Sequence, residues 1–118
     1  MPTSRLTIGE VARRTGVATS ALRFYEQRGL IVSERTDSGQ RRYRPDTIRR
    51  VSFVLTAQRI GLSLDDIANA LAALPSRRTP SRRDWSRVAA TWLPLLDQRI
   101  NGLQQLRSRL DALCVNLS

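Results

Sequence analysis

The side chains in this sequence that could do chemistry are arginines, and their pattern suits binding to a polyanion rather than catalysis. All twenty basic residues are arginine, ten residues are acidic, and the formal net charge is +10 over 118 residues. Histidine is absent, and the sequence shows no paired carboxylates in a loop, no phosphate-binding glycine motif and no metal-ligand spacing. The composition therefore argues against an enzyme. It favours a nucleic acid as the partner, because basic side chains release counterions from phosphates.

Two short helices with a tight turn between them are predicted near the N-terminus. Thr7 and Glu10 form a T-x-x-E capping box, which begins the first helix, and Gly16 ends it. A second helix follows the turn, with Thr19 or Ser20 as its cap. This layout predicts a helix-turn-helix, a unit that places its second helix in the major groove of duplex DNA.

The second helix has one polar and one apolar face. At about 100° per residue, Ser20, Arg23 and Gln27 share the outer face, whereas Leu22 and Tyr25 lie on the inner one. Arginine suits bidentate contact with guanine or pairing with phosphate, so Ser20 and Arg23 are predicted to reach base edges. The alternative is that Arg23 is an ordinary solvated arginine. The full set of DNA contacts predicted for this helix is Thr19, Ser20, Arg23 and Tyr25.

A β-hairpin is predicted to follow this helix as a wing. Two strands, 32–35 and 41–43, can pair across the turn-forming sequence DSG. Because side chains alternate along a strand, Arg41 and Tyr43 should point together and Arg42 should point to the other side. One of these faces should meet the phosphate backbone, so all three side chains are predicted DNA contacts. The alternative is a small hairpin that is merely solvated.

The rest of the chain is predicted to be helical. Two apolar helices, the first ended by Gly61 and the second capped by Ser63, should close the core beneath the helix-turn-helix. The segment 75–81 is rich in proline, serine and arginine, which is typical of a linker. Ser81 and Asp84 then form another capping box, which begins the longest helix of the chain.

An apolar seam runs along this last helix, which is predicted to extend to about residue 113. A helix with such a seam buries it on a partner, so a coiled-coil homodimer is predicted. The alternative is that the seam folds back on its own domain. Pro94 lies inside the helix and predicts a kink, because it removes the hydrogen bond to the carbonyl of Ala90. The predicted dimerisation residues are Leu96, Ile100, Leu103, Leu106, Leu110 and Leu113.

Several segments in a fixed order resemble the MerR family of transcription regulators, and within it the SoxR branch. They are TIGEVARRTGV, ALRFYEQRGLI, GQRRYRPD and AQRIGLSL, and the similarity continues through LPSRRTPSRRDW and LDQRI. Together with the patterns above, the resemblance implies a mainly α fold. A winged helix-turn-helix domain with a small β-hairpin wing would occupy 1–74, a linker 75–81, and a dimerisation helix with a short tail 82–118. The long helix would form an antiparallel coiled coil.

The resemblance also implies a function. It predicts a dimer that binds an inverted-repeat promoter element, bends and untwists the DNA, and acts there with RNA polymerase. It further implies that Arg59 contacts a phosphate, although Arg59 could equally complement the dipole of its helix. The alternative class is a non-specific architectural protein that binds DNA or RNA through its basic charge. Such a protein would show no half-site symmetry.

The sequence departs from the SoxR branch at the residues that hold its cofactor. That branch carries a redox-active iron–sulfur cluster on cysteines directly after the dimerisation helix, and such a cluster needs four ligands. Cys114 is the only cysteine here, and Leu113 stands where the first ligand would be. No cofactor is therefore predicted. Cys114 is expected to be a small buried hydrophobe, with pairing to its mate across a dimer as the alternative.

The sequence shows neither the apolar core of a signal peptide nor an apolar run of the roughly 20 residues that a membrane span requires. A cytoplasmic protein is therefore expected. The sequence ends shortly after the long helix, which fits either a minimal regulator or part of a longer chain. The inducing signal and the operator sequence are left open.

Overall fold

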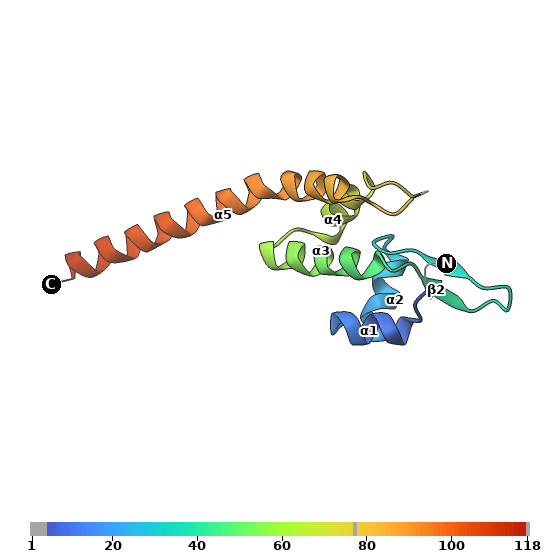
Figure 1. The fold of residues 1–118 in the computed structure, drawn as a ribbon. Coiled ribbons are helices and arrows are strands. Elements are labelled where there is room, and N and C mark those ends of the chain that lie inside the picture. The colour runs from blue at the N-terminus through green and yellow to red at the C-terminus, as the bar shows by residue number, and fades with distance from the viewer. Residues whose placement is uncertain (1–4, 77, 118) are drawn as a thin grey trace.

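The computed structural model describes residues 5–76 and 78–117, and these form five helices and one two-stranded sheet. A small domain lies at one end of the molecule, and a long helix projects from it (Figure 1). The elements in chain order are α1 (Ile8–Thr15), α2 (Thr19–Gln27), β1 (Ser33–Arg35), β2 (Arg41–Tyr43), α3 (Thr47–Ile60), α4 (Leu64–Leu71) and α5 (Arg82–Asn116).

The helix-turn-helix consists of α1 and α2. The predicted capping box of α1 is present, because the Thr7 hydroxyl accepts from the Glu10 backbone and the Glu10 carboxylate accepts from the Thr7 backbone. Gly16 ends the helix with φ 75°, a left-handed conformation that glycine adopts without a steric penalty. The prediction that Thr19 or Ser20 caps α2 is wrong. Ala18 occupies the cap position and makes no side-chain hydrogen bond, so α2 begins one residue earlier.

The wing is an antiparallel hairpin in which Ser33 pairs with Tyr43 and Arg35 pairs with Arg41. Leu6 extends the pairing, because its N–H donates to the Tyr43 carbonyl at 2.7 Å and its carbonyl accepts from the Tyr43 N–H at 2.8 Å. The chain before α1 therefore holds the inner end of β2. Gly39 turns the hairpin with φ 85°.

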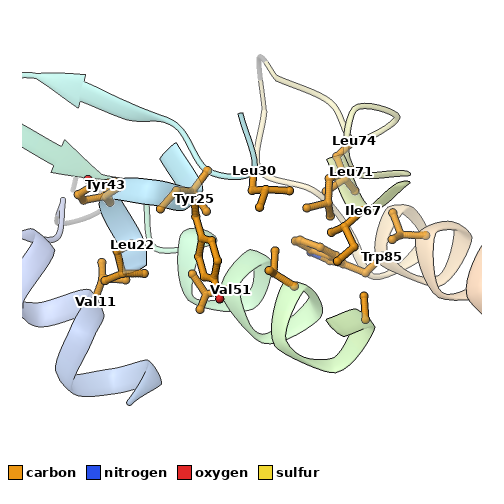
Figure 2. Packing of buried hydrophobic residues seen from close by; sticks show 14 of the residues in the cluster. Val11, Leu22, Tyr25, Leu30, Tyr43, Val51, Ile67, Leu71, Leu74 and Trp85 are labelled. Carbon is orange, nitrogen blue, oxygen red and sulfur yellow. The ribbon is translucent and has the colours of Figure 1, made fainter. Parts of the chain in front are cut away.

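One hydrophobic core joins the wing, the first four helices and the beginning of α5 (Figure 2). The residues of this core lie on the helical faces that the apolar spacing in the sequence predicted. Phe53 of α3 packs on two tryptophans of α5, with ring centroids 4.6 Å from Trp85 and 5.7 Å from Trp92. The first three turns of α5 thus belong to the domain. Core residues drawn from successive elements are Val11, Leu22, Tyr43, Val51, Ile67 and Trp85.

Beyond Trp92, no described residue of α5 is buried. The helix continues through Pro94 without a break, and its axis bends between the part on the domain and the projecting part (Figure 1). The apolar seam lies on the projecting part and is exposed, with Leu103 at 67%. In the single chain the seam therefore does not fold back on its own domain.

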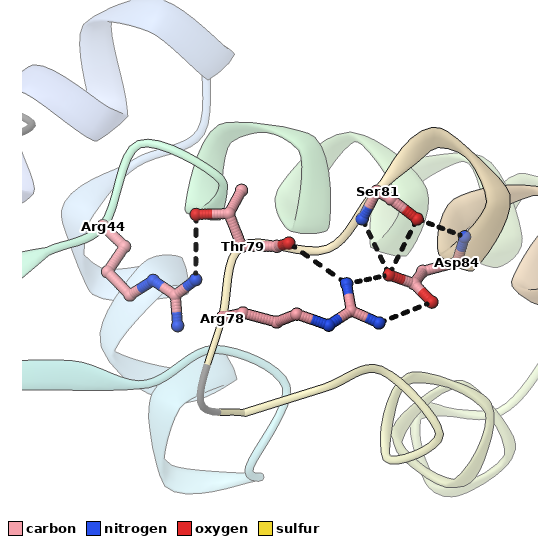
Figure 3. A network of polar contacts seen from close by, with 5 residues as sticks. All are labelled: Arg44, Arg78, Thr79, Ser81 and Asp84. Atoms are coloured by element: carbon pink, nitrogen blue, oxygen red, sulfur yellow. Dashed lines mark hydrogen bonds and ion pairs between the residues drawn. The ribbon is translucent and has the colours of Figure 1, made fainter.

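A polar network holds the start of α5 against the rest of the domain (Figure 3). Ser81 and Asp84 form the predicted capping box, and Asp84 also accepts from the Arg78 guanidinium at 2.7 Å. These hydrogen bonds, the one from Arg78 first, hold the pKa of Asp84 well below its usual range. Arg44, which follows the wing, donates to the Thr79 hydroxyl and the Ser76 carbonyl. Ser76 and Thr79, which precede α5, are thereby joined to the end of the hairpin.

Candidate nucleic-acid interface

The outer face of α2 is polar and open. Ser20, Arg23 and Gln27 are exposed, Thr19 is half-buried at the first helical position, and Leu22 on the opposite face is fully buried. The predicted division of the helix into two faces is therefore confirmed. An arginine on the free face of such a helix can make two parallel hydrogen bonds to a guanine edge or a phosphate.

A shallow groove joins α2 to the wing. Its volume is about 350 Å³, and its lining residues are Arg23, Glu26 and Gln27 of α2 and Arg41 of β2. The fold thus brings together Arg23 and Arg41, two of the predicted DNA contacts that lie 18 residues apart in sequence. Two guanidinium groups and the Glu26 carboxylate line this groove, so its net charge is positive, which suits a phosphate backbone.

Glu26 fastens the wing to α2. Its carboxylate accepts from the Tyr43 hydroxyl at 2.6 Å and from the Ser33 hydroxyl at 2.7 Å, and it lies 3.9 Å from the Arg41 guanidinium. Burial opposes ionisation of this carboxyl, but the hydrogen bonds from Tyr43 and Ser33 outweigh it and lower its pKa. A charged acceptor shared by both strands fixes the angle between wing and helix. Glu26 was not singled out from the sequence, where the only available signal was its position one turn after Arg23.

Two of the predicted DNA contacts, Tyr25 and Tyr43, have buried side chains, and this burial argues against the prediction for them. Tyr43 is 0% exposed and Tyr25 is 7% exposed. The Tyr43 hydroxyl donates a hydrogen bond to the Glu26 carboxylate, and the Tyr25 hydroxyl donates to the side chain of Gln58 at 3.1 Å. Burial and the nearby carboxylate raise the pKa of Tyr43 to about 12. Both rings belong to the core that supports the interface, and neither presents a free surface to DNA.

Arg42 and Arg59 do not line this groove. Arg42 is half-buried and binds within the hairpin, since it donates to the Gln40 side chain at 2.8 Å and to the Arg41 carbonyl at 2.9 Å. Arg59 is exposed in the last turn of α3, where its charge also complements the helix dipole. Their predicted contacts with DNA stay predictions.

The residues that the structure describes do not suit an iron–sulfur cluster. No group of three or more histidine, cysteine or acidic side chains that could hold a metal occurs among them. Cys114 is exposed on α5 in the single chain, so the expectation that it is buried is wrong for the protomer. One thiolate cannot supply the four ligands of such a cluster. No described helix is both long and apolar enough to cross a membrane.

The fold and the charged groove define a winged helix-turn-helix protein of the DNA-binding class. Two family models match the chain: the MerR helix-turn-helix family of regulatory proteins over residues 6–74, and the MerR DNA-binding model over residues 48–113. The chain belongs to the MerR family. It is a MerR-type transcriptional regulator and not an enzyme, so both of these predictions are confirmed.

Individual relatives agree with this assignment. The chain is 57% identical over 112 residues to a transcriptional activator named as a SoxR homolog in Chromobacterium violaceum, which covers 95% of this chain and 76% of that protein. A crystal structure of a MerR family regulator from Listeria monocytogenes has a TM-score of 0.67 and 29% identity, and covers 94% of this chain and 84% of that one.

A third structure shares the fold at lower identity. HiNmlR, a MerR family regulator lacking the sensor domain, was crystallised bound to promoter DNA. Its TM-score is 0.65 at 22% identity, with 97% of this chain and 88% of that chain covered. At this identity the match supports the fold alone.

Proposed function

We propose that this regulator binds an inverted-repeat promoter element as a homodimer and controls transcription by bending and untwisting the DNA. The observation that carries the proposal is the groove in which Arg23 of α2 and Arg41 of the wing lie together on one open face. In this arrangement α2 enters the major groove and reads bases through Ser20 and Arg23. The wing contacts the adjacent phosphates.

The homodimer accounts for two further features. The exposed seam of α5 requires a partner helix, and a second copy supplies an identical seam. Two recognition helices related by twofold symmetry then read two inverted half-sites. Membership of the family supports RNA polymerase as the further partner at the promoter and a cytoplasmic location. No cofactor takes part in the proposal, because the described residues do not provide its ligands.

The test is selection of binding sites from a random duplex pool. We expect two inverted half-sites, and we expect Arg23→Ala to lose the consensus. Arg109→Ala is the matched control, because it removes the same charge from the exposed projecting part of α5. It should retain the consensus. If no consensus is recovered and binding simply weakens as the salt concentration rises, the protein is instead a non-specific architectural protein that binds nucleic acid through its charge.

DNA distortion is tested separately on the selected site. Circularly permuted duplexes that carry the site at different positions should migrate differently in a gel when the protein is bound, because a bend slows migration most at the centre. Equal migration of all permuted complexes would remove bending from the proposal and leave sequence-specific binding intact.

A further inference from the structure

The contacts between α3 and α5 lie on both sides of Pro94. Before the proline, Trp92 packs against Phe53 in the core. Beyond it, Leu96 lines an apolar groove of about 330 Å³ between the two helices, together with Ile60 of α3. Leu96 is also the first residue of the apolar seam, so the groove and the seam are continuous.

The face of α5 that meets the domain continues to Arg99. Val88, Trp92, Leu96 and Arg99 follow one another at intervals of four, four and three residues, so their side chains lie on one side of the helix. The first three side chains are apolar. Arg99 therefore brings a positive charge to a position where the pattern predicts another apolar residue.

The guanidinium of Arg99 lies against Gly61, the residue that ends α3. A Cβ at residue 61 would be 2.6 Å from Nη2 of Arg99 and 2.8 Å from its Cζ. Both distances are shorter than van der Waals contact, so the arginine occupies space that any other residue at 61 would need. Gly61 also has φ 98°, a backbone conformation that glycine adopts without a steric penalty.

The end of α3 offers Arg99 a favourable electrostatic environment. The last carbonyl groups of a helix lack partners within the helix, and the helix dipole places partial negative charge at this end. Helix α3 ends at Ile60, directly before the glycine that Arg99 covers. The contact therefore combines close packing with an attraction between the guanidinium and the carboxyl end of α3.

Pro94 makes this contact important for the direction of the projecting part of α5. Proline removes the hydrogen bond to the Ala90 carbonyl, which leaves the helix less resistant to bending at this point. The core ends at Trp92, before the proline, and does not by itself fix the direction of the residues beyond it. Arg99 lies five residues after Pro94 and still contacts the domain, so it ties the projecting part directly to α3.

We propose that Arg99, seated on Gly61, is a positioning residue that fixes the angle between the DNA-binding domain and the projecting part of α5, and thereby determines which spacing of half-sites the dimer accepts. The inference rests on the proposed binding of a homodimer to an inverted repeat. Each base pair added between two half-sites rotates them by about 34° and separates them by about 3.4 Å. A fixed angle therefore selects one spacer length, whereas a loose angle tolerates several.

Affinity for duplexes whose spacers differ by single base pairs tests the proposal. We expect the wild type to bind about tenfold more weakly or worse when the best spacer is changed by one base pair, because protein or DNA must then deform. Arg99→Ala should lose about threefold or less and should keep the same half-site sequence. Arg99 is exposed, so this variant leaves the core intact.

Arg109→Ala is the control for charge, because it removes one arginine from the exposed projecting part of the same helix. It should retain the spacer dependence of the wild type. An undiminished spacer dependence in Arg99→Ala would overturn the inference, and so would an equal loss in Arg109→Ala.

Gly61→Ala disturbs the same contact from the side of α3. Its Cβ would displace the guanidinium, so the spacer dependence should weaken as it does in Arg99→Ala. Gly29→Ala is the matched control, because Gly29 has φ 76° and no described atom lies within 4 Å of the place that its Cβ would take. It strains the backbone in the same way and should keep the spacer dependence. Equal weakening in both glycine variants would assign the effect to backbone strain and overturn the role of the contact.

Spin labels measure the angle without DNA. Labels at Arg14→Cys on α1 and Gln105→Cys on α5, in a Cys114→Ser background, report the distance between the domain and the projecting helix. Both positions are exposed, and dilution with unlabelled protein leaves one labelled chain in each dimer. Arg99→Ala should broaden the distribution of this distance. An equally narrow distribution would show that Arg99 does not fix the angle.

Sedimentation and site selection separate this inference from the proposed function. Wild type and Arg99→Ala should both sediment as dimers, and a monomer in Arg99→Ala alone would assign the arginine to the dimer contact and overturn its role towards α3. If the wild type recovers no paired half-sites, the proposed function fails. If both proteins recover paired half-sites with the same single spacing, only the inference about Arg99 fails.

Discussion

At the scale of single residues, two buried tyrosine hydroxyls make hydrogen bonds that hold the candidate DNA interface in place. The Tyr43 hydroxyl donates to the Glu26 carboxylate at 2.6 Å, whereas the Tyr25 hydroxyl donates to the neutral Gln58 amide at 3.1 Å. We expect Tyr43→Phe to lower the free energy of unfolding by about 1.5–3 kcal/mol, the range for hydrogen bonds to charged groups. Tyr25→Phe is the matched control and should cost about 0.5–1.5 kcal/mol. Urea unfolding followed by circular dichroism measures both, and equal losses would contradict a special role for Glu26.

Glu26 also predicts how stability depends on pH. Its pKa in the folded protein lies below the ordinary value of 4.5, so the unfolded chain takes up a proton first as the pH falls. The stabilisation from this carboxylate is therefore fully present above pH 4.5 and is lost as the pH falls through the lower folded pKa. Urea midpoints measured from pH 7 to pH 3 should fall more steeply for the wild type than for Glu26→Gln. Parallel curves for the two proteins would refute this contribution.

The same residues show how far the sequence could predict the site. Strand alternation placed Arg41 and Tyr43 on one side of β2, and both do reach Glu26. The sequence could not reveal that this side faces α2, because alternation fixes relative directions and not which neighbour lies opposite. Tyr43 was therefore assigned to DNA although its ring is in the core. The exposed position of Arg23 could be predicted, because it follows from the helical periodicity of α2 alone.

At the scale of elements, the start of α5 depends on one short polar cap. The Ser81 hydroxyl accepts from the Asp84 backbone at 3.2 Å, and the Asp84 carboxylate accepts from the Ser81 backbone at 2.7 Å. We expect Ser81→Ala to cost about 1 kcal/mol of unfolding free energy, since it leaves a helix N–H without its partner. Ser86→Ala, exposed within the same helix, is the control and should be neutral or slightly stabilising. An equal loss in both variants would mean that the cap does not stabilise the helix.

Helix boundaries were predictable wherever a local signal specified them. The capping boxes at Thr7 and Ser81 and the glycines at 16 and 61 mark the observed ends, because their geometry involves only neighbouring residues. The start of α2 carries no such cap and was misplaced, since packing of Leu22 into the core stabilises this helix instead. The start of α2 could not be predicted from its neighbouring residues, because it depends on packing against residues that are distant in sequence.

At the scale of the whole molecule, apolar and charged surfaces lie apart. The core ends at Trp92, and α5 carries its apolar seam beyond the domain that it helps to build. Only the presence of that seam could be predicted from one sequence. Its continuity with the groove between α3 and α5 could not, because the groove arises from two helices that are distant in sequence.

The net charge predicts a measurable salt dependence of DNA binding. If Arg41, Arg42 and Arg59 of both protomers contact phosphates, roughly six counterions are released, and log affinity against log salt should have a slope of roughly −5. Fluorescence anisotropy on the selected duplex at several salt concentrations measures this slope. Arg59→Ala should make the slope shallower by roughly 2 without changing the preferred sequence, whereas Arg23→Ala should lose that preference. An unchanged slope in Arg59→Ala would assign this arginine to the dipole of α3 alone, and the phosphate contacts would then be confined to α2 and the wing.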